Sequence, residues 1–177
     1  SGRVAVIVPH GVLFRGGAEG RIRQQLIEEN LLDAVVGLPA NLFTTTGIPV
    51  AILIFDRSRE EGGANSDRRD VLFIDASKEF TPGKTQNVMD DAHVAKVLET
   101  YGTRAEVERY SHRASPEEIA ENGYNLNIPR YVDTFEEEEP VDLAAVSKEL
   151  KEVAERSRST DATIADYCNQ LDIDTPF

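Results

Sequence analysis

Phe43 and the threonines that follow it, Thr44 to Thr46, are the side chains best placed to bind a ligand. They stand in a short segment, Pro39–Gly47, that interrupts two apolar runs. An aromatic ring exposed in such a loop is either a hydrophobic plug or a surface on which a planar group stacks. The hydroxyl groups add hydrogen-bonding capacity beside that ring. What this loop does depends on the elements that position it.

Two strands joined by a helix precede the loop, and a third strand follows it. Apolar runs predict a buried strand over Arg3–Val8 and a second over Leu32–Leu38, with a helix over Ala18–Asn30 between them. Strand–helix–strand units form right-handed parallel crossovers. The apolar run Ile48–Phe55 returns through the short loop, so it should lie antiparallel to the second strand, with both of its faces buried.

The predicted sheet places two loops on one rim. In open α/β sheets, ligands bind beyond the carboxyl ends of the parallel strands. His10–Gly17 follows the first strand and Pro39–Gly47 follows the second, so both belong to that rim. Gly16–Gly17 before the helix is either a turn or an anion-binding helix start, and we favour the turn.

Further along the chain, polar and apolar segments alternate. Ser58–Asp70 is a polar loop, and Tyr124–Val132 is an irregular, aromatic-rich segment. Further predictions are a strand over Val71–Ile74, a helix over Asp90–Gly102 with Asp90 and Gly102 as its caps, and a short helix that Ser115 caps and that ends near Asn122–Gly123.

The C-terminal region is acidic and helical. From Asp133 to Phe177 there are 13 acidic and 4 basic residues, which account for most of the net charge of −13. Glu136–Glu139 reads as a linker, and a helix should begin at Pro140. Its apolar residues form a narrow stripe, which packs on its own domain or on a partner helix. The stripe is Leu143, Val146, Leu150 and Val153, continued by Ile164, Tyr167 and Leu171.

Several functional classes are disfavoured. The 177 residues contain no apolar run long enough for a membrane span, and they include a single cysteine, Cys168. We therefore expect a soluble, cytosolic chain without a disulfide or a metal site. Gly83-Lys84-Thr85 lacks the upstream glycine of a phosphate-binding loop, because that position is Lys78. No nucleophile–base pair or glycine-rich cofactor fingerprint is present, and the strand that starts at Arg3 suggests a part of a longer protein.

The stretch GRVAVIVPHGVLFRGGAEGRIRQQLIEENLLDAVVGLPANLFTTTGIPVAILIFDR closely resembles the modification subunit of type I restriction–modification systems. The segments VLFIDAS, GKTQN and YNLNIPRYV are also similar to that family, as is the acidic helical tail. The resemblance implies a Rossmann-like, S-adenosylmethionine-dependent methyltransferase fold. Its fifth, sixth and antiparallel seventh strands would correspond to Arg3–Val8, Leu32–Leu38 and Ile48–Phe55.

The resemblance also implies a chemistry. Such subunits transfer a methyl group from S-adenosylmethionine to N6 of adenine in DNA, after the base has left the stack. An Asn-Pro-Pro-aromatic motif grips the amine, and a second aromatic residue supports the base; here that position is Phe43. Other residues of the two rim loops are candidates for the pocket or for DNA contact: Asn41, Thr44, Thr45, Thr46 and His10.

The sequence departs from the family in one respect. Both the Asn-Pro-Pro-aromatic motif and the glycine-containing cofactor motif are absent, and in the family both lie before this segment. We therefore expect a C-terminal part that is inactive alone and that leaves S-adenosylmethionine mainly to the preceding part. Its predicted divisions are the C-terminal half of the sheet domain over 1–75, an α+β extension over 76–135, and a helical assembly tail over 136–177.

The resemblance implies DNA and protein partners. Family members work with a specificity subunit and a second modification subunit, and in some assemblies with a restriction subunit. Leu143, Val146, Leu150 and Val153 are candidate assembly contacts. Arg15, Arg21 and Arg23 are candidates for phosphate contact, but an ordinary solvated helix also explains them, and we favour that interpretation. The rival functions are a non-catalytic DNA- or protein-binding module and a related methyltransferase acting on RNA or protein.

Overall fold

The computed structural model describes residues 2–44, 46–134 and 142–176. It divides into two compact units, Ser1–Phe135 and Glu136–Phe177, each of which is treated by itself below. In the described part of the chain, no helix is both long enough and apolar enough to cross a membrane.

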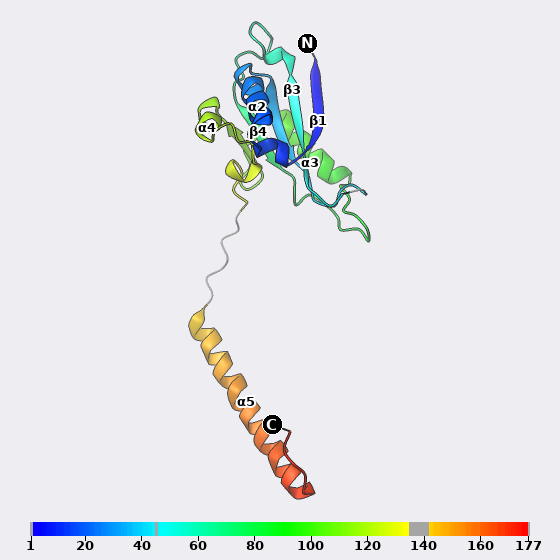
Figure 1. Cartoon of the computed structure of the whole chain (residues 1–177), viewed down its shortest axis with the longest axis vertical. Helices are drawn as coiled ribbons and strands as arrows, with labels where there is room; N and C mark the ends of the chain where they lie inside the picture. The colour runs from blue at the N-terminus through cyan, green and yellow to red at the C-terminus, as the bar shows by residue number, and fades with distance from the viewer. Residues whose placement is uncertain (1, 45, 135–141, 177) are drawn as a thin grey trace. The chain divides into compact units, whose positions relative to one another are not determined.

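The first unit is an α/β sandwich around a five-stranded sheet (Figure 1). The strands are β1 (Arg3–Pro9), β2 (Leu32–Gly37), β3 (Val50–Asp56), β4 (Val71–Asp75) and β5 (Ser111–Ala114), in the order β1-β3-β2-β4-β5. The helices are α1 (Gly11–Phe14), α2 (Ala18–Glu28), α3 (Asp91–Thr103) and α4 (Pro116–Glu121), with short 3-10 turns η1 (Arg57–Arg59) and η2 (Ile128–Arg130).

The topology agrees with the predicted fold class. β3 is antiparallel to both β1 and β2, so β1 and β2 run in the same direction with β3 between them. β4 is parallel to β2, and β5 adds a second antiparallel strand that the sequence analysis does not predict. The predicted loop His10–Gly17 contains the single-turn helix α1.

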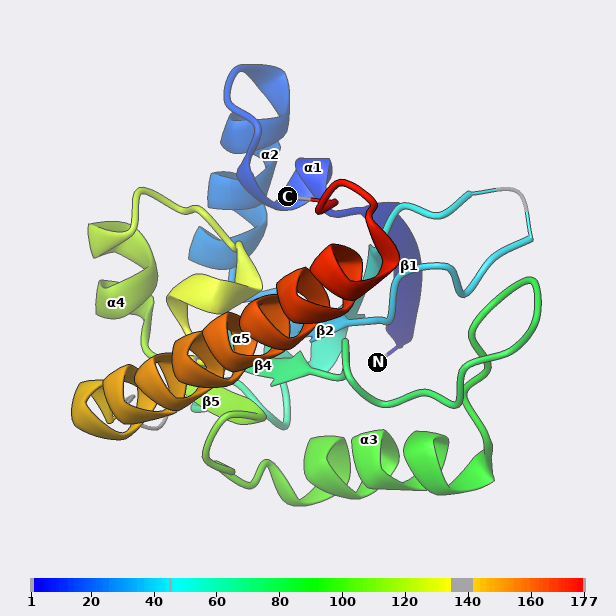
Figure 2. The same cartoon turned by 90° about the horizontal axis from the view of Figure 1, so that it is seen from below.

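Two apolar clusters cover opposite faces of the sheet. One joins Val35 and Phe73 to α1, α2, α4 and the segment around Tyr131, whose ring stacks on Phe73 with centroids 3.9 Å apart. The other joins Val36 and Ile74 to α3. Figure 2 shows α2 and α3 on opposite sides of the strands. The aromatic-rich segment is therefore part of the core.

The prediction of a buried first strand is wrong for the described unit. Val4, Val6 and Ile7 are 58%, 41% and 56% exposed. β1 lies at an edge of the sheet with β3 as its partner. Because side chains alternate along a strand, these residues leave both faces of β1 apolar and open. Ile48 is likewise 63% exposed and precedes β3.

Three of the predicted helix ends in the first unit agree with the structure, and one does not. Asp90 caps α3 by accepting from the backbone N–H groups of Ala92 and His93, and Ser115 caps α4 through Glu118 N–H. Gly123 has a φ of 64° just beyond α4, as expected for a left-handed helix exit. Gly102 does not end α3, because the helix continues through Thr103 and its left-handed cap is Arg104.

The second unit contains one long helix, α5 (Leu143–Leu171). Asp142 caps its start by accepting from the N–H groups of Ala144 and Ala145. The predicted start at Pro140 and the predicted linker Glu136–Glu139 lie outside the described residues. Within this unit, the stripe residues Leu143, Leu150 and Leu171 are 77%, 65% and 69% exposed.

Candidate functional site

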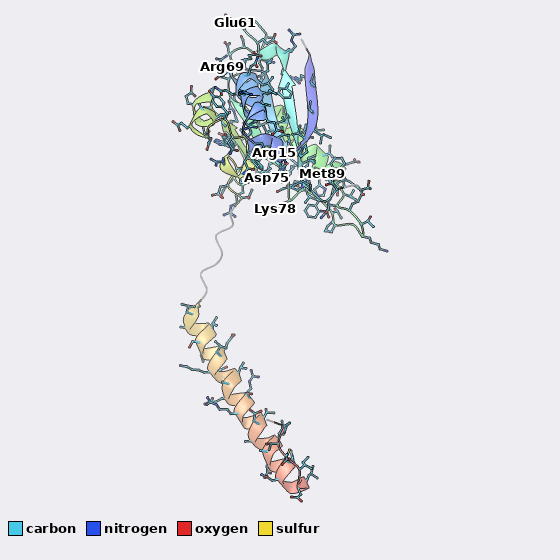
Figure 3. All side chains as sticks on the ribbon, in the orientation of Figure 1. Arg15, Glu61, Arg69, Asp75, Lys78 and Met89 are labelled. Carbon is cyan, nitrogen blue, oxygen red and sulfur yellow. The ribbon has the colours of Figure 1, made fainter. Side chains whose placement is uncertain are left out.

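Three loops gather at one end of the sheet, which we call the open end. They are residues 10–17 after β1, residues 38–49 after β2 and residues 76–90 after β4. Since β1, β2 and β4 run in the same direction, their carboxyl ends share that edge. In Figure 3, Arg15, Lys78 and Met89 lie toward this end, whereas Glu61 and Arg69 lie at the other.

The loop that carries Phe43 is a narrow, backbone-bonded hairpin. Leu38 N–H donates to Val50 O at 2.9 Å, and Asn41 N–H donates to Gly47 O at 3.3 Å. Thr46 N–H closes its tip on Phe43 O at 3.3 Å. These bonds use backbone groups only, and Phe43 itself is 38% exposed. We call residues 38–49 the Phe43 loop.

The other polar residues of the Phe43 loop have different environments. Asn41 is exposed and has a φ of 54°, a left-handed conformation that asparagine tolerates. Thr44 is exposed, while the Thr46 hydroxyl accepts from Ile48 N–H at 3.1 Å and so supports the turn. Thr45 lies outside the described residues.

His10 links the loop after β1 to the base of the Phe43 loop. Its Nε2 lies 3.2 Å from the carbonyl oxygen of Val50, the first residue of β3. With the Nε2 tautomer protonated, this contact is a hydrogen bond donated by the imidazole. The structure therefore brings His10 and the Phe43 loop together on one rim, as the predicted topology requires.

The three candidate arginines differ in exposure. Arg15 is exposed, and its Nη1 atom lies 4.0 Å from Glu19 Oε1. Arg21 is exposed on α2. Arg23 is buried: its guanidinium donates to Val12 O at 2.7 Å and to Tyr124 O at 3.2 Å. The solvated-helix interpretation is therefore wrong for Arg23, which ties α2 to α1 and to the segment behind it.

The apolar spacing of α2 does not predict correctly which of its residues are buried. The spacing of Ile22, Leu26 and Ile27 puts all three on one apolar face of the helix, yet Ile22 is 58% exposed. The next residue, Arg23, takes the inward position because the carbonyl groups of α1 and Tyr124 need donors there. Gly17, with a φ of 70°, forms the turn before α2.

The loop Phe80–Val88 also belongs to the open end, although the sequence does not predict it there. Asn87 N–H donates to Asn41 O at 2.8 Å, and the Asn87 side-chain Nδ2 donates to Ala40 O at 2.8 Å. The loop therefore contacts the base of the Phe43 loop. The only available signal was the segment GKTQN, noted as a family likeness and as an incomplete phosphate-binding pattern.

The open end carries no preformed metal centre among the described residues, where no group of three His, Cys, Asp or Glu side chains is suitable for a metal ion. Its exposed side chains include two aromatic rings, those of Phe14 and Phe43, together with amides, hydroxyls and the cations Arg15, Lys78 and Lys84. These groups can stack on a planar ring and bind anionic oxygen atoms. The Thr81 hydroxyl donates to Asp90 Oδ2 at 3.5 Å, but that carboxylate also caps α3.

Comparison with known proteins assigns the family. Curated relatives include the type I restriction enzyme MpnII methylase subunit of Mycoplasma pneumoniae, 29% identical over 98% of this chain and 31% of its own length. The MjaVIII methylase subunit of Methanocaldococcus jannaschii is 34% identical over 85% of this chain and 26% of its length. The chain thus spans less than a third of these relatives.

Solved structures show the same fold. The methyltransferase subunit of the type I restriction–modification system from Streptococcus thermophilus is 55% identical, with a TM-score of 0.70 over 76% of this chain and 27% of that one. The EcoKI M protein matches with a TM-score of 0.61 over 94% of this chain and 41% of that one, at 21% identity. Because the N-6 DNA Methylase family model also matches residues 1–140, the chain belongs to that family.

Proposed function

We propose that this chain is the C-terminal part of the methyltransferase subunit of a type I restriction–modification system. The full subunit would transfer a methyl group from S-adenosylmethionine to N6 of adenine in DNA. The supporting comparisons are the 55% identity to a solved subunit of this kind and the names of the curated relatives. The observation in this chain that carries the proposal is the exposed Phe43 ring at the open end of the sheet.

The edge strand β1 supports the placement within a larger sheet. Val4, Val6 and Ile7 are half exposed, although apolar side chains on both faces of a strand are typical of strands covered by helices on both sides. Burying such residues stabilises a fold by roughly 1.5–3 kcal/mol for each large side chain. A preceding part of the subunit that pairs with the free edge of β1 would recover that energy.

The role of Phe43 follows from the geometry of base flipping. An adenine that has left the duplex loses its stacking neighbours, and an aromatic ring in the pocket replaces part of that interaction. Stacking of a base on an aromatic side chain is worth roughly 1–3 kcal/mol. The backbone-bonded hairpin holds the ring at the rim without burying it, so the ring is available to the base.

The described residues alone do not fit S-adenosylmethionine. Their rim loops expose polar groups and two aromatic rings, those of Phe14 and Phe43, and the family's glycine-containing cofactor motif is absent from this sequence. We therefore propose that the preceding part of the subunit supplies most cofactor contacts. Binding of S-adenosylmethionine to this chain alone with micromolar affinity, measured by calorimetry, would contradict that division.

The decisive experiment replaces Phe43 in the full-length subunit, assembled with its partners. Phe43→Ala should lower kcat/KM for DNA methylation about 10- to 100-fold, because the base loses its stacking surface. Phe43→Tyr keeps the ring and should stay close to wild type, and Phe43→Leu keeps apolar volume without the ring. Equal activity of the alanine and tyrosine variants would refute the stacking role.

DNA phosphate binding is proposed for two exposed cations, Arg15 in the loop after β1 and Arg21 on the following helix α2. Arg23 is not included, because its guanidinium already donates to two backbone carbonyl groups. Asn41, Thr44 and Thr46 are proposed as pocket residues or DNA contacts, and the same proposal stands for Thr45 from its sequence position. His10 is proposed to brace the rim.

For α5 we propose assembly with helices of a specificity subunit, in a complex that contains a second modification subunit and in some systems a restriction subunit. The support is the exposed apolar stripe of α5, whose spacing of three and four residues is typical of helix-to-helix packing. Replacing Val146 and Leu150 with aspartate should abolish assembly, measured by analytical ultracentrifugation. The exposed Lys151→Asp is the matched control.

A further inference from the structure

The loop Phe80–Val88 is an ordered part of the open end that the function proposed above leaves unused. Thr81 N–H donates to Val88 O at 2.8 Å, and Val88 N–H donates to Thr81 O at 3.0 Å, so the two ends of the loop are paired. Gly83 is packed so closely that a Cβ there would lie 2.3 Å from the carbonyl oxygen of Gln86. The loop is thus a closed turn with a defined shape.

Asn87 joins this turn to the Phe43 loop through two hydrogen bonds. Its backbone N–H and its side-chain Nδ2 each donate over 2.8 Å to consecutive carbonyl groups, those of Asn41 and Ala40. These carbonyls stand at the point where the chain leaves the core and turns toward Phe43. One residue thereby fixes two successive peptide groups, which restricts both the position and the direction of the hairpin.

A shared apolar base supports the same arrangement. Leu42 of the Phe43 loop and Met89 just after the second loop both pack against one core cluster, which includes Leu38 and Val50. In Figures 1 and 2 the cyan segment of the Phe43 loop and the green segment before α3 lie beside each other. The two loops are therefore braced as a pair.

We propose that Asn87 is a positioning residue for DNA methylation, and that Phe80–Val88 is the second wall of the pocket that Phe43 enters. The inference rests on the function proposed above. It adds a residue, Asn87, whose amide sets where the Phe43 ring stands. A displacement of about 1 Å in such a group costs up to about 100-fold in rate.

The sequence offers a matched control at the other end of the sheet. Asn65 also uses Nδ2 to hold a loop, donating to Ser58 Oγ at 2.7 Å. Asn87→Ala and Asn65→Ala therefore remove the same chemical group from two loop anchors. Asn87→Asp is a third variant: it keeps the backbone bond and the side-chain shape but replaces the Nδ2 donor by a carboxylate oxygen facing Ala40 O.

The test uses the full-length subunit assembled with its partners and two forms of the DNA: one carries adenine at the target position and serves for the kinetics, and the other carries 2-aminopurine there and reports base flipping by its fluorescence. We expect Asn87→Ala and Asn87→Asp to lower kcat/KM for DNA at least tenfold, to reduce the 2-aminopurine fluorescence increase, and to leave KM for S-adenosylmethionine unchanged. Asn65→Ala should keep wild-type values for all three. Amide hydrogen exchange over residues 41–47 should accelerate in the Asn87 variants alone.

Different results separate the two proposals. Unchanged exchange over residues 41–47 in Asn87→Ala would overturn the positioning role, as would faster exchange with wild-type kcat/KM and fluorescence. A wild-type assembly that transfers no methyl group to adenine would instead refute the proposed function, while the exchange measurement would still report whether Asn87 holds the loop.

Discussion

The two ends of the sheet differ in which groups make their hydrogen bonds. At the end away from Phe43, which we call the closed end, Asp33 is 1% exposed and accepts hydrogen bonds from the side chains of Arg59, Arg104 and Tyr101. Arg104 also donates to Asp70, and Arg113 completes the set. Charged side chains there bind one another.

At the open end, backbone groups make most of the hydrogen bonds. The Phe43 loop and Phe80–Val88 are held mainly by peptide N–H and carbonyl groups, with side-chain hydrogen bonds made by Thr46, Thr81 and Asn87. Side chains such as Phe43, Thr44 and Lys84 point into solvent. Charged side chains therefore stabilise the fold at the closed end, whereas at the open end exposed side chains remain available to bind a ligand.

The first prediction tests the closed end and has the largest expected effect. Asp33→Ala removes the common acceptor and leaves two guanidinium groups without it in the interior. Breaking a buried ion pair from one side costs about 3–5 kcal/mol of the free energy of unfolding. Urea unfolding of the variant should show that loss, whereas the exposed Asp67→Ala should stay within about 0.5 kcal/mol of wild type. A small loss for Asp33→Ala would mean that this end is not a stability element.

The second prediction concerns the acid sensitivity of the same end. Burial raises the pKa of Asp70, but hydrogen bonds from Arg113 and Arg104 outweigh burial and hold that pKa at about 2. Since the pKa in the unfolded chain is higher, about 3.9, Asp70 stabilises the fold fully above pH 4. That contribution is lost as the pH falls from about 4 toward 2.

We expect the loss to amount to about 1–2 kcal/mol, because the Arg113 side chain is half exposed and water screens its charge. Asp70→Asn removes the titration, so its stability should fall less steeply than that of wild type over this pH range. Unfolding measured from pH 5 to 2 gives both slopes. Parallel curves for the two proteins would assign the acid sensitivity to other carboxylates, among them Asp56, whose pKa is also about 2.

The contrast between the two ends also marks what sequence reasoning can reach. Local patterns predicted β2 and β3 and the caps Asp90 and Ser115, because apolar runs and capping side chains act over a few residues. They missed β5, a four-residue strand containing His112 and Arg113, which exists because β4 offers it a free edge. They also predicted that β1 is buried, whereas its apolar residues are exposed in the described unit.

The position of the site at one end of the sheet could be predicted from the sequence, whereas the contacts between distant segments could not. Loop placement on one rim follows from strand direction, so the neighbourhood of His10 and the Phe43 loop was predictable. The burial of Arg23 and the bonds of Asn87 depend on carbonyl groups far away in the sequence, and no local pattern encodes them. One signal was overlooked: Asp33 inside the apolar strand Leu32–Gly37 requires a buried cation, which is Arg59.

The third prediction returns to the open end and has the smallest expected effect on stability. A Cβ at Gly47 would lie 2.5 Å from the Asn41 Oδ1 atom, so Gly47→Ala requires the exposed Asn41 side chain to move. Because that side chain can rotate into solvent, the free energy of unfolding should fall by no more than about 1 kcal/mol. In the full-length subunit of the proposed function, the Phe43 hairpin, bonded between Asn41 and Gly47, should shift enough to lower DNA methylation severalfold. A loss of 3 kcal/mol or more in urea unfolding would erase the distinction between the ends, whereas a near-normal stability with reduced activity would confine the function of this end to its loops.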